Sequence, residues 1–282
     1  MDIQRLAAFT YNDLGGNPAG VAICEVMPAI EVMQRIAAEV GYSETVFAAP
    51  ISNGYRVRYF APAMEIPFCG HATIAFGAVL ADRGELGPIN LQLNDGTAIV
   101  EGVRTASGLS ATLHSGPTRQ EAAPRELLNN SLELFSLSHS DLDDRFPPAI
   151  IEAGARHMLL ALRDRQRLAA MCYDLQDGSV LMNDWHLATI SLIQSESSSR
   201  YHARNPFAAG GVYEDPATGA AAAALVAYLQ ALGIAGAESI EVIQGEDMGV
   251  PCLLNADAPT QPGGSARVRG TVRFLPARAA NT

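Results

Sequence analysis

The sequence predicts an α+β protein with two similar halves, each a β-sheet wrapped around one central helix. Its first basis is an internal repeat: "EIPFCGHATIAFGAVL" begins at residue 65 and "EDPATGAAAAALVAYL" at residue 214, and their shared Glu, Pro, Gly and Leu keep a constant separation of 149 residues. Both strings continue as helices with almost no polar face, and such a helix must be enclosed by protein on all sides. Strand signals dominate the rest of the chain, so we expect the enclosing wall to be a curved sheet.

The first half alternates strand and helix signals. A helix is expected over residues 27–41, with Pro28 near its start and Gly41 placed to end it. The first apolar helix follows Gly70 and stops at "DRGELG". Strands are expected at 4–9, 19–24, 43–50, 55–62, 89–95, 97–103 and 108–114, the last three as an antiparallel meander.

A connector separates the two halves. Residues 115–148 lose the alternation and gain Pro, Ser and charge, with one helix expected at "PRELLNN". We therefore expect an N-terminal half over 1–115 and a C-terminal half over 116–282, with the last strand able to return to the first half. Beyond the connector and a short helix near 165–171, strands are expected at 148–154, 156–162, 187–194, 198–207, 239–245, 251–256 and 265–275.

Composition narrows the class of protein. A chain of 282 residues that is 48% hydrophobic can bury a large core, and two domains are expected at this length. The net charge is −11 and no stripe of Lys or Arg is present, which argues against nucleic acid or an anionic membrane as a partner. No secretory signal is visible, and the longest apolar run is interrupted at Gln230. The four cysteines lie far apart, which fits a reducing cytoplasm.

Motifs for several chemistries are missing from the sequence. No His, Asp or Glu spacing is typical of a metal site, and neither G-x-G-x-x-G nor a P-loop occurs. G-x-S-x-G, the usual signal of a serine hydrolase, is also absent. We therefore expect neither a metal nor an organic cofactor.

The two apolar helices predict a binding site for a small anion. Their N-termini carry backbone N–H groups that need partners, and the helix dipole there favours negative charge. Gly70 and Gly219 would let the backbone approach a ligand closely. Two such ends facing each other across a cleft would bind a small carboxylate.

Five blocks connect the chain with a known family. In order, "GNPAGVA", "YSETVF", "FAPAMEIPFCGHAT", "RNPFAAGGVYEDPATGAAAAAL" and "QGEDMG" span about residues 10 to 250. Together they resemble the phenazine-biosynthesis-like (PhzF-like) isomerase family. The resemblance implies a diaminopimelate-epimerase-like fold, with two pseudo-symmetric halves that are each a mixed, mostly antiparallel β-barrel around a central helix. It also implies cofactor-independent isomerisation by proton transfer in the cleft between the halves, and homodimers are common in that family.

The resemblance also implies the site. Its catalytic carboxylate corresponds to Glu44, joined by His71 and Asp215, and the residues implied to bind substrate are Cys69, Gly70, Thr218, Gly219 and Ala220. Related epimerases carry a cysteine at both helix mouths, whereas this chain has Cys69 at one and Thr218 at the other. A threonine hydroxyl cannot act as a base near neutral pH, so the proton-moving role falls to Glu44. Enclosure between helix ends and sheet walls is expected to raise the pKa of Glu44.

Each site residue also has a structural interpretation. Glu44 could face water, Asp215 could cap its helix, and Cys69 could be a small buried hydrophobe. His157, Arg156, His202 and Arg204 could line the cleft. Two departures from the family pattern, Ala220 in place of Ser and Val250 before Pro251, argue against assigning the substrate of phenazine producers.

Three functions therefore stay open. The first is a Glu44-centred isomerase acting on a small carboxylate. The second is an amino-acid-type epimerase or racemase that uses Cys69, and the third is a non-catalytic small-ligand binding protein.

Overall fold

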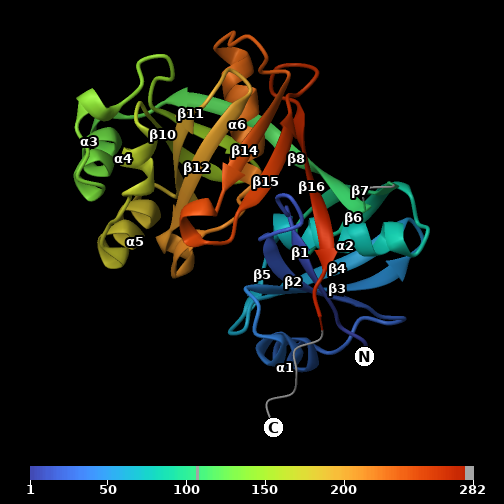
Figure 1. Cartoon of the computed structure of the whole chain (residues 1–282). Coiled ribbons are helices and arrows are strands. Elements are labelled where there is room, and N and C mark those ends of the chain that lie inside the picture. The colour runs from blue at the N-terminus through green and yellow to red at the C-terminus, as the bar shows by residue number, and fades with distance from the viewer. Residues whose placement is uncertain (106–107, 277–282) are drawn as a thin grey trace. The chain divides into compact units, whose positions relative to one another are not determined.

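The computed structural model describes residues 1–105 and 108–276, and its chain divides into two units (Figure 1). The first unit holds residues 1–114 together with the described residues from Arg269 onward, and the second holds Ser115–Val268. Two long strands, β8 (Gly108–Ala122) and β16 (Ser265–Phe274), therefore contribute residues to both units. No helix among the described residues is long and apolar enough to cross a membrane.

The first unit is a mixed sheet around α2. Its strands follow the order β16-β1-β2-β3-β4-β6-β7-β8, with β2–β3 and β4–β6 parallel, and β8 also pairs with β16. Helix α1 ends at Gly41, which takes the left-handed conformation expected of a C-terminal glycine. The elements are β1 (Gln4–Ala8), β2 (Asn17–Ile23), α1 (Ile30–Val40), β3 (Glu44–Ile51), β4 (Gly54–Phe60), β5 (Glu65–Ile66), α2 (Gly70–Asp82), β6 (Gly87–Gln92) and β7 (Thr97–Thr105).

The second unit repeats this plan around α6. Its strand order is β8-β9-β10-β11-β12-β14-β15-β16, with β10–β11 and β12–β14 parallel. Short 3-10 turns lie at His139–Asp141, Ala208–Gly210 and Glu246–Met248. The elements are α3 (Arg125–Leu134), β9 (Ala149–Ala153), β10 (Arg156–Leu162), α4 (Arg165–Ala169), α5 (Leu175–Asp184), β11 (Thr189–Ser195), β12 (Arg200–Phe207), β13 (Val212–Asp215), α6 (Gly219–Ala231), β14 (Ser239–Gln244) and β15 (Cys252–Asp257).

The expected connector over residues 115–148 is wrong for its first residues, 115–122, which are part of a strand. Residues up to Ala122 continue β8 and pair with β9, Thr118 lying opposite Ala153. Polar residues conceal this strand in the sequence, because its side chains there are mostly exposed. The helix expected at "PRELLNN" is present as α3, whereas α5 was not expected. Asp174 starts α5 by accepting hydrogen bonds from the backbone N–H groups of Gln176 and Asp177.

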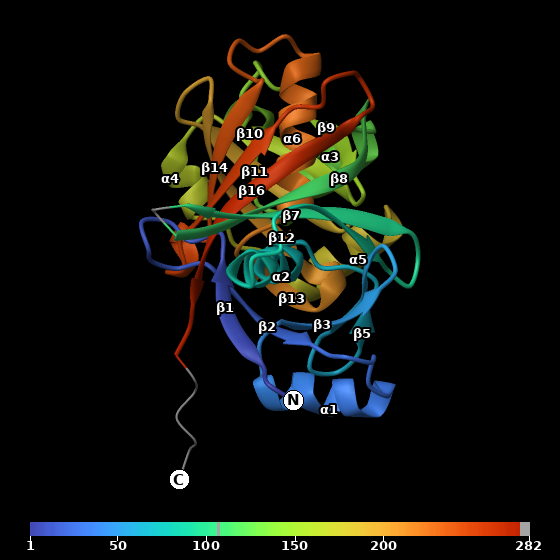
Figure 2. The same ribbon diagram turned by 90° about the vertical axis from the view of Figure 1, so that its right-hand side faces the viewer.

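The two central helices are equivalent. Each has 13 residues, and α2 starts at Gly70 and α6 at Gly219, so both keep the separation of the sequence repeat. Figure 2 shows α2 surrounded by β1, β2, β3 and β7, all of which contact it. A Cβ on Gly102 of β7 would lie 2.1 Å from the carbonyl oxygen of Gly77 in α2. Small residues therefore let the strand approach the helix closely, as the sequence predicted.

A bidentate ion pair precedes each central helix at the same register. In the first unit Phe60 lies opposite Glu65, and Glu65 pairs with Arg58 at 2.7 and 2.5 Å. In the second unit Pro206 lies opposite Glu214, and Glu214 pairs with Arg204 at 3.0 and 2.5 Å. In each case the arginine stands two residues before the glutamate's strand partner. The pairs fix the short strands β5 and β13, which lead directly into the helix tips.

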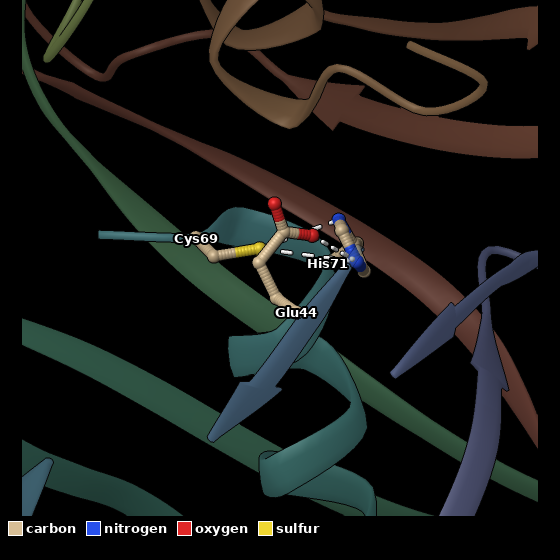
Figure 3. A group of neighbouring side chains, drawn as sticks. All are labelled: Glu44, Cys69 and His71. Carbon is tan, nitrogen blue, oxygen red and sulfur yellow. Dashed lines mark hydrogen bonds and ion pairs between the residues drawn. The ribbon is translucent and has the colours of Figure 1, made fainter. Parts of the chain in front are cut away.

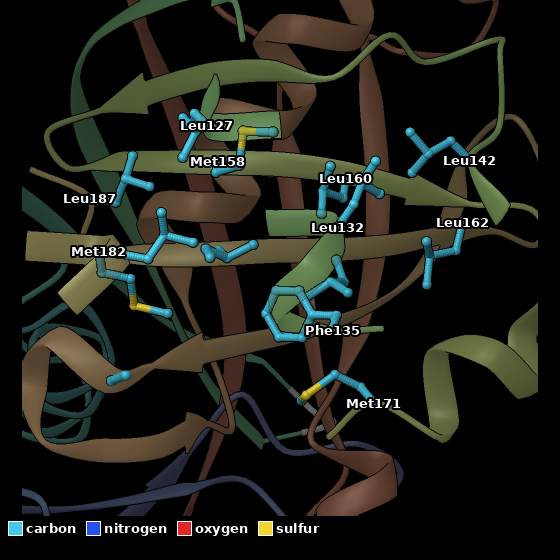
Figure 4. Close-up of a cluster of buried hydrophobic side chains, with 14 of the residues drawn as sticks. Leu127, Leu132, Phe135, Leu142, Met158, Leu160, Leu162, Met171, Met182 and Leu187 are labelled. Atoms are coloured by element: carbon cyan, nitrogen blue, oxygen red, sulfur yellow. The ribbon is translucent and has the colours of Figure 1, made fainter. Parts of the chain in front are cut away.

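The second unit also has a core on its other face. Alternate residues of β10, namely Met158, Leu160 and Leu162, pack with side chains of α3 and α5 (Figure 4). Because successive strand residues point to opposite faces, His157, Leu159 and Ala161 face the other way, toward the side that carries α6. His157, the polar residue among these three, therefore lies on the face of the sheet that carries α6.

Candidate active site

The first helix tip brings Cys69, Gly70 and His71 to the start of α2. Cys69 has an extended backbone and is the N-cap residue, and the helix begins at Gly70. A Cβ on Gly70 would meet only one atom among the described residues, Leu113 Cδ2, at an ordinary 3.7 Å. Packing within the described chain therefore does not demand glycine here, and its role beside a ligand stays a prediction.

Glu44, Cys69 and His71 converge at this tip (Figure 3). Glu44 is the first residue of β3, and its Oε2 lies 3.1 Å from His71 Nε2. On the other side of the ring, Cys69 Sγ lies 3.3 Å from His71 Nδ1. The Glu44 side chain is only 16% exposed, so it does not project freely into water. The Glu44–His71 contact is an ion pair, since Oε2 accepts no well-aligned hydrogen bond within the described chain.

Two further residues contact the His71 ring. Asn17 Nδ2 lies 3.1 Å from Nδ1, and Ser43 Oγ lies 3.4 Å from Nε2. A side-chain amide can turn either its NH₂ group or its oxygen toward the ring, and a hydroxyl can donate or accept. Both neighbours can therefore accommodate the ring with or without its second proton.

The predicted rise in the pKa of Glu44 is wrong. Burial raises the pKa of Glu44, but the close contact and charge of His71, with contacts from Ser43 and Cys69, lower it below its ordinary value. Desolvation and the presence of His71 in the site were expected from the sequence, whereas the direct contact of its imidazole with the carboxylate was not. The carboxylate form of Glu44 is therefore favoured across the neutral range.

His71 is held in its charged form. Burial opposes the charge, but contacts with Cys69 and Glu44 outweigh it and raise the pKa of His71 well above 6.5. Burial also raises the pKa of the Cys69 thiol. Cys69 therefore stays protonated near neutral pH, and the negative charge beside His71 is that of Glu44.

The same three side chains include the ligand types of a divalent cation. Their carboxylate, thiol and imidazole ligand atoms all lie within 4.8 Å of one another. Their mutual contacts already satisfy the imidazole, as the distances above show. The three side chains therefore form a group that could also hold a metal ion.

The second helix tip is organised around Asp215. Thr218, the N-cap residue of α6, donates its hydroxyl to Asp215 Oδ2 at 2.7 Å. The buried Gln244 accepts from Thr218 N at 3.1 Å and donates to the carbonyl oxygen of Asp215 at 2.6 Å. Asp215 thus shapes the turn before the helix. Gly219 is buried as the first residue of α6, and Ala220 stands where the repeat places His71 in α2.

Sequence reasoning missed three contacting residues. All three stand inside blocks that carry the family resemblance: Asn17 in "GNPAGVA", Ser43 in "YSETVF" and Gln244 in "QGEDMG". All three are polar residues next to Gly, Pro or Glu at the ends of strands. That position is the one feature of the sequence that could have indicated them as site residues. Their partners could not be read from spacing, because Asn17 and His71 are distant in sequence.

Each of the four residues that the sequence suggested as possible lining of the cleft contacts another side chain of the chain. Arg204 is buried and pairs with Glu214, and Arg156 pairs with Glu121. His202 lies between Glu246 and Glu196, at 2.6 and 3.2 Å. His157 is fully buried.

Comparisons with known proteins identify the family to which the chain is similar. A model of the PhzC-PhzF family, described as phenazine biosynthesis-like protein, matches residues 6–272. The chain is 33% identical to an uncharacterized isomerase of Deinococcus radiodurans, covering 95% of this chain and 87% of that protein. It is 30% identical to trans-2,3-dihydro-3-hydroxyanthranilate isomerase of Pseudomonas fluorescens, covering 89% and 88%.

Solved structures show the same fold. A structure from Pseudomonas aeruginosa described as a predicted epimerase superposes with a TM-score of 0.81 at 27% identity, covering 99% of both chains. A probable proline racemase from Agrobacterium radiobacter superposes with a TM-score of 0.65 at 12% identity, covering 99% of this chain and 93% of the other. The α+β, diaminopimelate-epimerase-like fold with two pseudo-symmetric halves is thereby confirmed.

Proposed function

The chain belongs to the family of phenazine biosynthesis-like proteins and is an isomerase of that family, and from this premise we propose that Glu44 is its general acid and base. The substrate is a small carboxylate-bearing molecule, and the reaction moves a proton from one carbon to another without a metal or organic cofactor. The observation that carries this proposal is the contact of Glu44 Oε2 with His71, at 3.1 Å in a buried site.

The chemistry follows from the protonation states. Glu44 is a carboxylate whose Oε2 has no well-aligned donor among the described residues, so a lone pair remains for a substrate proton. As the C–H bond breaks, the electron pair passes into the substrate's unsaturated system. The adjacent charged His71 stabilises the anion that forms, and the proton returns to a different carbon.

The thiol route has less support. A catalytic cysteine must be a thiolate, whereas burial raises the pKa of Cys69. The corresponding position at the other tip is Thr218, whose hydroxyl is bonded to Asp215. Cys69 is better explained as a hydrogen-bond partner of His71.

Deuterium incorporation tests the role of Glu44. The purified protein is incubated in D₂O with trans-2,3-dihydro-3-hydroxyanthranilate and with a set of small unsaturated or α-amino carboxylates, and products are analysed by mass spectrometry. We expect incorporation by the wild type and a loss of about 10²-fold or more in Glu44→Gln, because the amide cannot take the proton.

Glu39→Gln is the matched control, because Glu39 is exposed on α1. It should exchange at the wild-type rate, and circular dichroism should show that both variants are folded. Undiminished turnover by Glu44→Gln would move the base to another residue.

A further inference from the structure

A chain of three buried polar side chains crosses the second unit. His157 Nδ1 lies 2.7 Å from Thr189 Oγ1, and that hydroxyl donates to Asn205 Oδ1 at 3.2 Å. The three residues belong to the neighbouring strands β10, β11 and β12, and none is more than 2% exposed. Such a chain in an otherwise apolar interior requires an explanation.

The orientation of the Asn205 amide sets the tautomer of His157. With the amide oxygen facing Thr189, the single proton of the Thr189 hydroxyl goes to Asn205, and the hydroxyl accepts the bond from His157. Nδ1 of His157 therefore carries the proton. Burial lowers the pKa of His157 to about 4, so the ring is neutral near pH 7 and Nε2 is a bare acceptor.

This acceptor lacks a partner. Nε2 of His157 is buried and receives no hydrogen bond from any part of the chain that the structure describes. A buried polar atom left unpaired has lost its bonds to water without replacement, which is unfavourable. A donor that is not part of the described protein would remove this cost.

The acceptor lies on the side of the sheet that carries α6. Arg204 reaches the carbonyl oxygen of Ala169 in α4 and pairs with Glu214, so these two side chains share the α4 side. The next residues along the two strands, Asn205 and Asp215, point the other way and are opposite each other in the β12–β13 pair.

Asp215 connects this group with the helix tip. It accepts the hydroxyl of the N-cap residue Thr218, so the His157 chain lies at the level of the α6 N-terminus. That N-terminus is suited to an anion.

The internal repeat makes the placement more specific. Glu44 begins β3 and is the Cα partner of Ala19, and Thr189 begins β11 and is the Cα partner of His157, each in a parallel pair. Thr189 thus occupies in the second unit the place that Glu44 occupies in the first. Where one unit has a charged acid–base group, the other has an uncharged acceptor.

We propose that the second unit binds a small ligand at His157, whose Nε2 accepts a hydrogen bond from a hydroxyl or uncharged amino group. Because the N-terminus of α6 favours an anion, the ligand is assigned to carboxylates that also carry such a donor. An ammonium group fits less well, because it would have to be desolvated beside a neutral ring. His157 Nδ1 and Thr189 set the orientation of the ring.

Nitrogen-15 NMR of the full chain tests the proposal with three stable probes. Anthranilate and 3-hydroxyanthranilate carry a carboxylate with one or two donor groups, and benzoate carries the carboxylate alone. The ring signals are assigned with His157→Gln, and each probe is added up to about 10 mM, the range of weak ligands. The free protein should show Nδ1 protonated and Nε2 bare from pH 6 to 8.

We expect the Nε2 signal of His157 to move toward its protonated position with the two donor-bearing probes and to stay in place with benzoate. The donor-bearing probes should bind up to about tenfold more tightly than benzoate, since one hydrogen bond is worth about 1 kcal/mol. His157→Leu should abolish that preference, whereas His157→Gln, which keeps an acceptor, should retain part of it. His139→Gln, a change at an exposed histidine, should leave the preference as it is.

A protonated Nε2 in the free protein, or an Nε2 signal that all three probes leave in place, overturns the proposal. These results are separable from those for Glu44. Deuterium exchange that depends on Glu44 together with an unresponsive His157 would retain the proposed function and overturn this inference. A responsive His157 without exchange would do the reverse.

Discussion

Glu44 and His71 form a pair in which each member stabilises the charge of the other. The pKa of Glu44 lies below its ordinary value and that of His71 well above 6.5, despite burial that disfavours both charges. Their states therefore differ from those of isolated side chains over a wide range of pH. The Glu44 carboxylate and the neighbouring His71 cation coexist throughout the neutral range.

The pH dependence of turnover follows from this pair. Glu44 loses its charge only as the pH falls through its lowered pKa, so we expect activity to persist down to about pH 4.3, the ordinary glutamate value. His71 keeps its charge as the pH rises past 6.5, so no step is expected there. A kcat profile for exchange between pH 4 and 9 checks both limits. An inflection near pH 6.5 would contradict the assigned state of His71.

Cys69 provides a second test at the residue scale. Because its thiol stays protonated and contacts His71, Cys69→Ser keeps a hydrogen-bonding group and should lower the exchange rate by less than about tenfold. The measurement is deuterium exchange alongside Glu44→Gln. A loss as large as that of Glu44→Gln would favour the epimerase mechanism based on the thiol.

The state of Glu44 shows how far the sequence reaches. The family resemblance carried by the block "YSETVF" implied a catalytic carboxylate, and the apolar surroundings indicated desolvation. The sign of the pKa shift depends on a 3.1 Å contact with a histidine 27 positions later in the chain, which no local pattern encodes. Similarly, the sequence indicated Asp215 as a site residue but not Gln244, whose side chain donates a hydrogen bond to the carbonyl oxygen of Asp215 in the turn before α6.

At the scale of elements, the paired glutamates Glu65 and Glu214 hold the strands that lead into the helix tips. Both pairs are bidentate, but Arg204 and Glu214 are the more deeply buried. A buried charge without its partner is costly, whereas replacing both partners removes two charges together. The two pairs should therefore respond differently to substitution.

We expect Arg204→Met to destabilise the protein by about 3 to 5 kcal/mol, because Glu214 is left buried and unpaired. The double change Arg204→Met with Glu214→Leu should recover most of that loss. Arg58→Met, in the more exposed pair, should cost less. Urea unfolding followed by circular dichroism measures all three. Equal losses in the single and double variants would show that Glu214 does not need its arginine for charge compensation.

The central helices were predictable because their apolar residues cover every face, and the constant separation gave their equivalence. The ion pairs that precede them were hidden, since Arg58 and Arg204 are separated from their glutamates by seven and ten residues. The second part of β8 was hidden for another reason. Its exposed polar side chains give no alternation, and only pairing with β9 makes it a strand.

For the whole molecule, the two long strands β8 and β16 have the largest consequence. Each contributes to both units, so neither unit can unfold completely while these strands stay intact. We expect a single cooperative transition in urea. The only tryptophan, Trp185, lies in the second unit and reports on it alone, whereas circular dichroism reports on both. Separate midpoints for fluorescence and circular dichroism would contradict the expectation.

The route of β16 also affects how the protein is made. In the first unit, β1 pairs with β16, Leu6 lying opposite Phe274. A ribosome releases Leu6 well before Phe274, and the whole second unit is made between them. The portion of the chain made first therefore has an unpaired strand edge until β16 has been made, and a nascent chain that stalls in the second unit would expose that edge to other chains.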